Sequence, residues 1–303
     1  MVNFRYHVVS LIAVFAALAI GVVLGAGPLQ TRVASVASSR NDSAANSAET
    51  ARLKTAAEAE AVGVKSIAAQ ILTGKLSDVA VVTVALPGAS SDDVALVRTH
   101  LETAGAKIAG AVSLSDNWDA DRMATYRQTL ATPIQSHLTS SLGTNVTSDG
   151  VIGAAIVEVL TSSGAERDLV QEILTDANTP IMSIDQQLET PAQALLLIGP
   201  RSSGGTGSGE AQAAVSDRAV SAWVGIAQAV AKAPQSGVLL GDASSDSAML
   251  AQVRTLGAGI STVDSVGTAT AALSAVLALP QAKNESVAYG SALGAQQGMP
   301  KIS

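Results

Sequence analysis

The chain has 303 residues, a formal net charge of −7 and a pI of about 4.9. This acidic balance argues against a nucleic-acid-binding protein and against a polybasic membrane-surface binder, because both need clustered positive charge. The sequence contains 0 Cys, 3 His and 5 Met. Disulfides, Cys-based metal sites and thiolate nucleophiles are therefore excluded, and ligands for a soft metal are scarce.

The first predicted element is a membrane-spanning helix over residues 8–26, a stretch of 19 residues without a charge. A helix of this length rises about 28 Å, close to the thickness of the hydrocarbon core. The alternative is a cleaved signal peptide, whose apolar region is usually shorter. The short leader favours a cytoplasmic N-terminus, although the Lys/Arg balance across the span is nearly even. We therefore expect residues 1–27 to form a cytoplasmic leader and a single-pass anchor in the cell membrane, with the main domain outside the cytoplasm.

Small residues recur every four positions within this span, at Ala13, Ala17, Gly21 and Gly25. At that spacing they lie on one side of a helix, where small side chains allow two backbones to approach closely. The pattern predicts a helix–helix contact in the membrane. Chance spacing in an Ala-rich span is the alternative.

Residues 28–75 are rich in good helix formers and predict a helical, coiled-coil-like stalk. A frayed seven-residue apolar pattern runs through the segment. Its predicted packing positions are Leu29, Val36, Leu53, Val64, Ile67 and Ile71. We expect a homodimer through the membrane helix and this stalk. The alternative is a loose Ala/Ser linker around residues 38–47.

Residues 76–303 predict an α/β domain. The β-branched run at 79–86 is typical of a buried strand, an amphipathic helix follows at 92–105, and residues 107–114 form a second strand. Such a βαβ unit requires parallel strands. Further strands are expected at 193–199, 237–241 and 259–263, with helices at 118–130, 149–162, 166–176, 210–233, 247–256 and 267–279. The pattern predicts a Rossmann-like parallel sheet, which the loop-like stretch 132–147 could divide into two lobes.

A glycine-rich loop at 199–209 follows a strand and precedes a helix, the position at which backbone N–H groups can bind phosphate. A P-loop would need Lys where the sequence has Gly205, and a dinucleotide fingerprint would need Gly where it has Glu210. The loop is therefore better explained as a flexible linker. An enzyme that uses this loop stays open as the less favoured interpretation.

Three carboxylates follow the second predicted strand, at Asp116, Asp119 and Asp121. Carboxylates at the end of a strand can hold Mg²⁺ or Ca²⁺, but the spacing fails the EF-hand pattern, and helix capping is the simpler interpretation. The same interpretation applies to Asp242 and Asp246. No catalytic motif accompanies the histidines. The sequence therefore predicts no catalytic, cofactor-binding or metal-ligating residue, and no enzyme.

Three stretches together resemble one protein family. They are residues 5–21, residues 81–106 with the segment Leu86-Pro87-Gly88-Ala89, and the tail Tyr289-Gly290-Ser291 with Gly294-Ala295 and Pro300. In order and spacing they are similar to the actinobacterial MctB family, "mycobacterial copper transport protein B". This resemblance covers nearly the whole chain.

The resemblance implies an envelope protein with one membrane helix, a coiled stalk and an α/β body. The family name implies a part in copper efflux or homeostasis, so copper is the one ligand implied, by resemblance alone. Related members, called SteB, are described as partners of the membrane protein SteA in cell division, affecting a peptidoglycan hydrolase. The resemblance supplies no ligand motif. We therefore expect a non-enzymatic, membrane-anchored scaffold that binds partner proteins, with a copper transport component as the alternative.

Overall fold

The computed structural model describes residues 29–140, 142, 146–201 and 216–302, with side chains from residue 46 onward. The predicted anchor, with its stripe of Ala13, Ala17, Gly21 and Gly25, lies outside these residues. So does most of the glycine-rich loop. Within the described ranges, no helix combines the length and the apolar character needed to cross a membrane.

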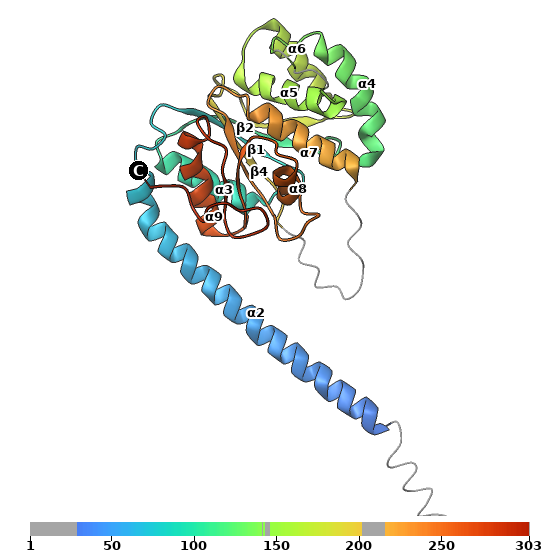
Figure 1. Ribbon diagram of the computed structural model, residues 1–303, viewed down its shortest axis with the longest axis vertical. Coiled ribbons are helices and arrows are strands. Elements are labelled where there is room, and N and C mark those ends of the chain that lie inside the picture. Colours follow the sequence, from blue (N-terminus) through green and yellow to red (C-terminus); the bar gives the residue numbers. More distant parts are fainter. Residues whose placement is uncertain (1–28, 141, 143–145, 202–215, 303) are drawn as a thin grey trace, which may run out of the picture. The chain divides into compact units, whose positions relative to one another are not determined.

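Residues 29–72 form the single helix α2 (Leu29–Leu72), which covers most of the predicted stalk (Figure 1). The chain divides into two compact units, residues 1–59 and residues 60–303. The last three turns of α2 belong to the second unit, the α/β body. There they bury Val64, Ala68 and Leu72 against the body's core.

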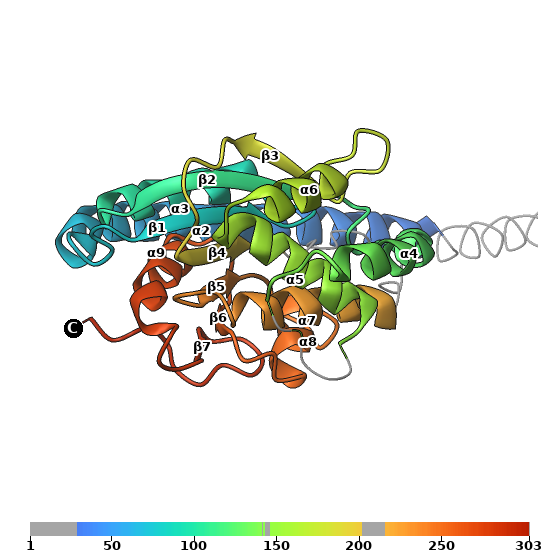
Figure 2. The same cartoon turned by 90° about the horizontal axis from the view of Figure 1, so that it is seen from above.

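The body is built on a seven-stranded sheet in the order β3-β2-β1-β4-β5-β6-β7 (Figure 2). The strands are β1 (Ala80–Ala85), β2 (Lys107–Leu114), β3 (Met182–Gln186), β4 (Ala194–Ile198), β5 (Gly237–Leu240), β6 (Ser261–Val263) and β7 (Ala288–Tyr289). Every pair is parallel except β2–β3, which is antiparallel. The predicted α/β class with a mostly parallel sheet is confirmed.

Helices cover both faces of this sheet (Figure 1). On one face, α3 (Ser91–Thr103), α9 (Ala269–Ala278) and the end of α2 enclose one hydrophobic cluster. On the other face lie α4 (Ala124–Gln135), α5 (Ser148–Thr161), α6 (Ala165–Leu174), α7 (Asp217–Val230) and α8 (Met249–Thr255). The short 3₁₀ helices η1 (Asp121–Met123) and η2 (Leu279–Gln281) complete the body.

The structure corrects three expectations about the body. First, strands β3 and β7 are present, although neither was predicted. Second, the stretch 132–147 was expected to be a loop, but α4 continues to Gln135, with Pro133 in its last turn and Ile134 fully buried. Third, this stretch does not divide the body into two lobes, because residues 60–303 form one unit around one sheet.

Candidate functional site

The strand order reverses between β1 and β4. The chain passes from β1 to β2 on one side of the sheet and later returns to β4 on the other side. In open α/β sheets, ligands bind in the crevice outside the carboxyl ends of the strands at such a reversal. In this body the crevice lies between the loop that follows β1 and Gly199-Pro200-Arg201 after β4. A ligand-binding site is therefore expected at this crevice.

An ion pair within the chain spans this crevice. Asp93, in the first turn of α3, is buried and accepts hydrogen bonds from Arg201 Nε at 2.7 Å and from its Nη2 at 2.9 Å. Donating these hydrogen bonds to Asp93 raises the pKa of the Arg201 guanidinium above its usual value. At the same point, a Cβ on Gly88 would lie 3.3 Å from Pro200 Cβ, so the two loops are in close contact.

Negative charge also occupies the helix terminus where a phosphate would bind. Asp92 and Asp93 both lie in the first turn of α3. A helix N-terminus attracts anions because its N–H groups carry partial positive charge. Here two carboxylates lie in that first turn, and one of them, Asp93, is paired with Arg201.

A shallow polar cavity of about 370 Å³ lies beside the crevice, lined in part by Arg201, Asp242, Ser244 and Thr268. The carboxylate of Asp242 accepts hydrogen bonds from Ser244 N at 3.1 Å and from Ser244 Oγ at 3.0 Å. It therefore stabilises a loop turn. The capping interpretation of Asp242 is wrong, because α8 starts after Ala248, which makes no side-chain cap. Asp246 contributes its backbone carbonyl to Gln252 Nε2 at 2.6 Å.

Two of the three carboxylates after β2 bond α7 (Asp217–Val230) or its N-cap Ser216, whereas the backbone carbonyl of Asp116 accepts a hydrogen bond from Ala120 N at 3.0 Å. Asp119 Oδ2 accepts a hydrogen bond from Trp223 Nε1 at 3.0 Å, and Asp121 accepts one from Ser216 Oγ. Burial raises the pKa of Asp119, and the Trp223 bond and the charge of Arg127 oppose this rise. The capping interpretation is wrong for these residues too, since η1 and α4 begin without a side-chain cap.

Arg127 is the fully buried centre of this region and was not predicted from the sequence. Its Nε donates to Asp149 Oδ1 at 2.7 Å, and its Nη1 donates to the carbonyls of Asn117 at 3.2 Å and Ala120 at 2.8 Å. Arg127 thus ties the loop after β2 to α4 and α5. In the part of the chain that the structure describes, no group of three or more His, Cys, Asp or Glu side chains is arranged to hold a metal ion.

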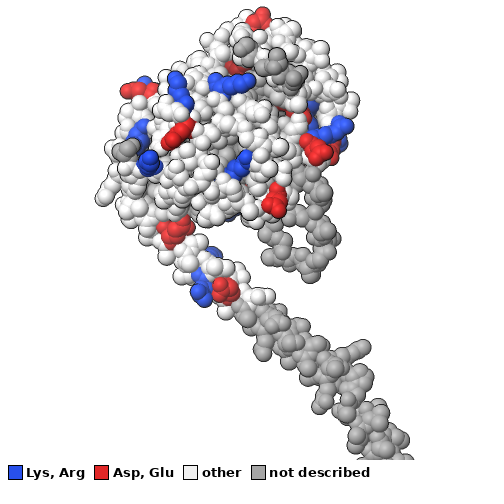
Figure 3. Space-filling model, viewed as in Figure 1, with Lys and Arg blue, Asp and Glu red and all other residues white. Residues whose placement is uncertain are grey.

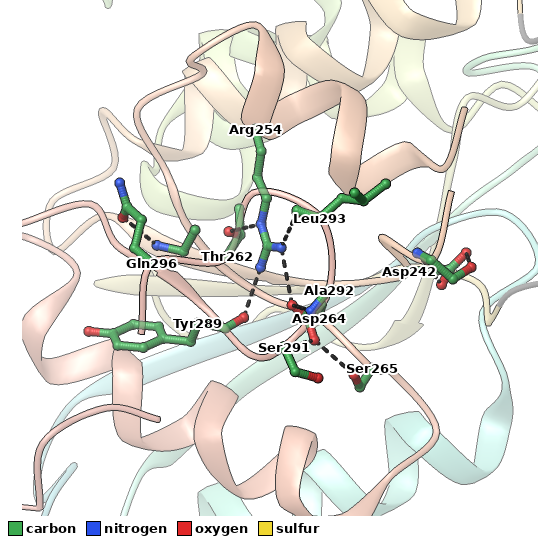
Figure 4. Close-up of polar contacts among 12 residues, drawn as sticks. Asp242, Arg254, Thr262, Asp264, Ser265, Tyr289, Ser291, Ala292, Leu293 and Gln296 are labelled. Carbon is green, nitrogen blue, oxygen red and sulfur yellow. Dashed lines mark hydrogen bonds and ion pairs between the residues drawn. The ribbon is translucent and has the colours of Figure 1, made fainter. Parts of the chain in front are cut away.

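A second buried network fixes the C-terminal tail to the sheet (Figure 4). Arg254 Nε donates to Thr262 Oγ1 at 2.9 Å, and Nη1 contacts Asp264 Oδ2 at 3.1 Å. The same guanidinium donates to the carbonyls of Leu293 at 2.7 Å and Tyr289 at 2.8 Å. This arrangement holds the tail beside β6.

The Asp264 carboxylate is completed by the tail itself. It accepts hydrogen bonds from the backbone N–H groups of Ser291 at 3.1 Å and Ala292 at 3.0 Å, and from Ser265 Oγ at 2.8 Å (Figure 4). The bend that brings these groups together needs Gly290, whose φ is +123° and where a Cβ would lie 2.1 Å from Asp264 Oδ1. Because the four groups that bond its two oxygens all come from the chain, Asp264 stabilises the fold.

This network predicts a specific loss of stability in acid. Burial acts to raise the pKa of Asp264, but bonds from Ser265, Ala292, Ser291 and Arg254 outweigh it, and the pKa lies below its usual value. A carboxylate of this kind contributes stability that is complete above its unfolded pKa of about 3.9 and is lost as the pH falls through its folded pKa. We expect the Tm of the wild-type protein to fall below about pH 4 more steeply than that of Asp264→Asn. If Tm fell equally steeply with pH in the two proteins, this assignment would be contradicted. The pKa of Glu158 is also lowered, but Glu158 is present in both proteins and therefore does not contribute to the difference between them.

The predicted stalk positions fall into two groups. Val64 is buried in the body's core and Ile71 packs partly against it, whereas Leu53 and Ile67 are 60% and 46% exposed. Leu29 and Val36 precede residue 46, the first residue whose side chain the structure describes. Leu53 and Ile67 are therefore the described positions left open for a partner helix.

The two histidines of the body make no joint site. His100 is buried in α3, and this burial lowers its pKa. His137 is half-buried, with its Nδ1 2.7 Å from Glu166 Oε2. Their different surroundings give no support to a paired histidine site.

The fold and these networks define an α/β module in which Asp93–Arg201, Arg127–Asp149 and Arg254–Asp264 form ion pairs within the chain. A family model described as "Copper transport outer membrane protein, MctB" matches residues 1–300, and the chain belongs to this family. The resemblance inferred from the sequence is thereby confirmed. The family description points to an envelope protein connected with copper transport. A comparison with curated proteins found no match.

Proposed function

We propose that the chain is a single-pass, non-enzymatic envelope scaffold. It is anchored by residues 8–26 with its N-terminus in the cytoplasm, and it carries an extracytoplasmic body that binds partner proteins. One observation carries this proposal: in the crevice where an α/β sheet would bind a substrate, the charged residues Asp93 and Arg201 are bonded to each other. A catalytic carboxylate must reach substrate, whereas both oxygens of Asp93 already bond Arg201.

The face of the body seen in Figure 3 is better suited to contact with a protein than with a polyanion. On the face shown in Figure 3, Lys and Arg alternate with Asp and Glu over a largely uncharged surface. Nucleic acid binding would instead need a continuous basic patch. The dispersed charge on this face supports a protein partner rather than a nucleic acid.

Two kinds of partner follow from the sequence and the family. A second copy is one, because Leu53 and Ile67 are exposed on α2 and lie two heptads apart. The resemblance to SteB-like members supplies the other, namely a SteA-like membrane protein and, through it, a peptidoglycan hydrolase in cell-division control. In this proposal the anchor and stalk bring the body to these partners.

Copper transport or homeostasis is the second candidate, and the family match is the finding that favours it. In that case copper would be the transported ion and not a resident cofactor of the protein. The described residues offer no group of three or more His, Cys, Asp and Glu for it. Met182 and Met249 are buried in the core, and Met299 is 37% exposed on the tail. We therefore infer that any role in copper transport is exerted through a partner that binds the ion.

A copper titration separates these candidates. We expect calorimetry of the full-length protein with Cu(I), and then with Cu(II), to show no stoichiometric binding. Weak Cu(II) uptake at the surface His137–Glu166 pair, where His137 is half-buried and Glu166 exposed, should disappear in His137→Ala, which is the matched control. Tight one-to-one binding that survives this substitution would overturn the scaffold proposal in favour of direct copper handling.

A further inference from the structure

A cavity of about 290 Å³ lies between α5 and α7, which run side by side (Figure 1). The backbones of these helices touch, because a Cβ on Gly153 would lie 2.8 Å from the carbonyl carbon of Gly225. Beside this contact the lining residues are small, with Gly150 and Ala154 on α5 and Ala229 on α7. Their side chains are too short to fill the space between the helices, which explains why a cavity is present.

The deeper part of this cavity is apolar. Val157, Ala229 and Ala233 are buried members of its lining, and Leu142 and Pro234 add further apolar surface. Sites for small molecules are typically concave and mostly apolar, with a few polar groups that fix the orientation of the ligand, and their volumes start at about 300 Å³. This cavity lies near that lower limit, so it suits a small ligand with an apolar body.

Glu158 is the one carboxylate among the described lining residues, and its acceptor positions are all in use. Its Oε1 accepts hydrogen bonds from Thr139 N at 2.8 Å and Thr139 Oγ1 at 2.6 Å. Its Oε2 accepts them from Ser140 N at 3.2 Å and Ser140 Oγ at 2.9 Å. Because a carboxylate has about four lone-pair positions, these bonds leave no free acceptor for a cationic ligand.

Two donors of the same lining remain available to a ligand. Gln228 and Lys232 are exposed and lie one helical turn apart on the same side of α7 and its C-terminal end. Neither side chain has a hydrogen-bond or ion-pair partner among the described residues. The ammonium of Lys has only donors, and the amide nitrogen of Gln donates as well. The rim of the cavity therefore favours a ligand that carries a negative charge.

We propose that this cavity binds a small apolar acid, with its apolar body between α5 and α7 and its carboxylate at Lys232 and Gln228. The body of the ligand is removed from water against the apolar lining. Its carboxylate accepts a charge-assisted hydrogen bond from Lys232, which is stronger than a bond between neutral groups. The site lies outside the crevice at the strand ends, and it does not depend on the proposed scaffold function.

Thermal unfolding of the full-length protein in lipid nanodiscs tests this proposal. The probe is phenylacetate, and phenylethanol is its neutral analogue with the same carbon skeleton. Phenylacetate should raise the Tm in a saturable way, by about 2–4 °C, and phenylethanol should raise it less. Lys232→Met should remove this difference, whereas Lys283→Met, at an exposed lysine outside the cavity, should retain it. The proposal is overturned if phenylacetate leaves the Tm unchanged, if the two compounds act equally, or if Lys232→Met responds as the wild type does.

A second measurement locates the bound acid. Because the chain contains no Cys, Ala154→Cys places a single thiol in the lining of the cavity. Phenylacetate should slow the alkylation of this thiol several-fold and leave the alkylation of Lys283→Cys unchanged. Equal rates at Ala154→Cys with and without phenylacetate, or equal slowing in the two variants, would show that the acid does not occupy this cavity.

Discussion

Replacing Arg254 by Ala is expected to lower the free energy of unfolding by about 3–5 kcal/mol, because it leaves a buried charge without its partner. The Asp264 side chain is 0% exposed and would lose its only ion-pair partner among the described residues. The carbonyls of Tyr289 and Leu293 would lose their Arg254 donor at the same time. Chemical denaturation of the variant and the wild type measures the difference.

Arg98→Ala is the matched control for this substitution. Arg98 pairs with Glu102 one helical turn away at 3.0 Å, with both side chains about half exposed, and its Nη1 donates to Gln186 Oε1 at 2.8 Å at the surface. Exposed pairs of this spacing contribute only about 0.3–0.5 kcal/mol. Comparable losses in the two variants would show that burial of the Arg254–Asp264 pair does not govern stability.

The second large effect is expected at the end of the stalk helix. Leu72 is completely buried in the cluster beneath α3 and α9, so Leu72→Ala should cost about 2–5 kcal/mol through lost contacts and the cavity left behind. Glu60 adds to this junction, because its carboxylate accepts a hydrogen bond from Thr270 N, in the first turn of α9, at 3.0 Å. Thermal or denaturant unfolding measures the loss.

Leu53→Ala on the same helix is the matched control, because Leu53 is 60% exposed. It should leave the unfolding of the body unchanged. A chain shortened to residues 60–303 should likewise unfold cooperatively, whereas one starting at residue 76 lacks Val64, Ala68 and Leu72 and should be markedly less stable. Equal stability of the two shortened chains would contradict the view that α2 completes the core.

The central strands could be predicted because each is a run of apolar or β-branched residues. β1 and β4, for example, are AVVTVA and ALLLI, buried on both faces. The edge strands gave no such signal. β3 is MSIDQ with three exposed side chains, and β7 has only two residues. The end of α4 was missed because Pro133 and its polar neighbours suggested a loop, although Ile134 anchors that turn in the core.

The networks of the candidate site could not be predicted, because they join residues far apart in the sequence. Asp93 and Arg201 are separated by 108 positions, and Asp119 and Trp223 by 104. The nearest helix start therefore seemed the natural partner for each Asp. The sequence did point to one residue of these networks. Gly290 belongs to the tail segment that resembles the family, and it is the residue that the bend beside Asp264 requires.

The most direct test of the scaffold proposal is affinity capture of the full-length protein from native membranes in mild detergent, with co-purifying proteins identified and bound copper quantified in the same preparation. The proposal predicts a second protein recovered in near-stoichiometric amount and no copper retained by the chain itself. Recovery of the chain alone, carrying copper, would contradict it.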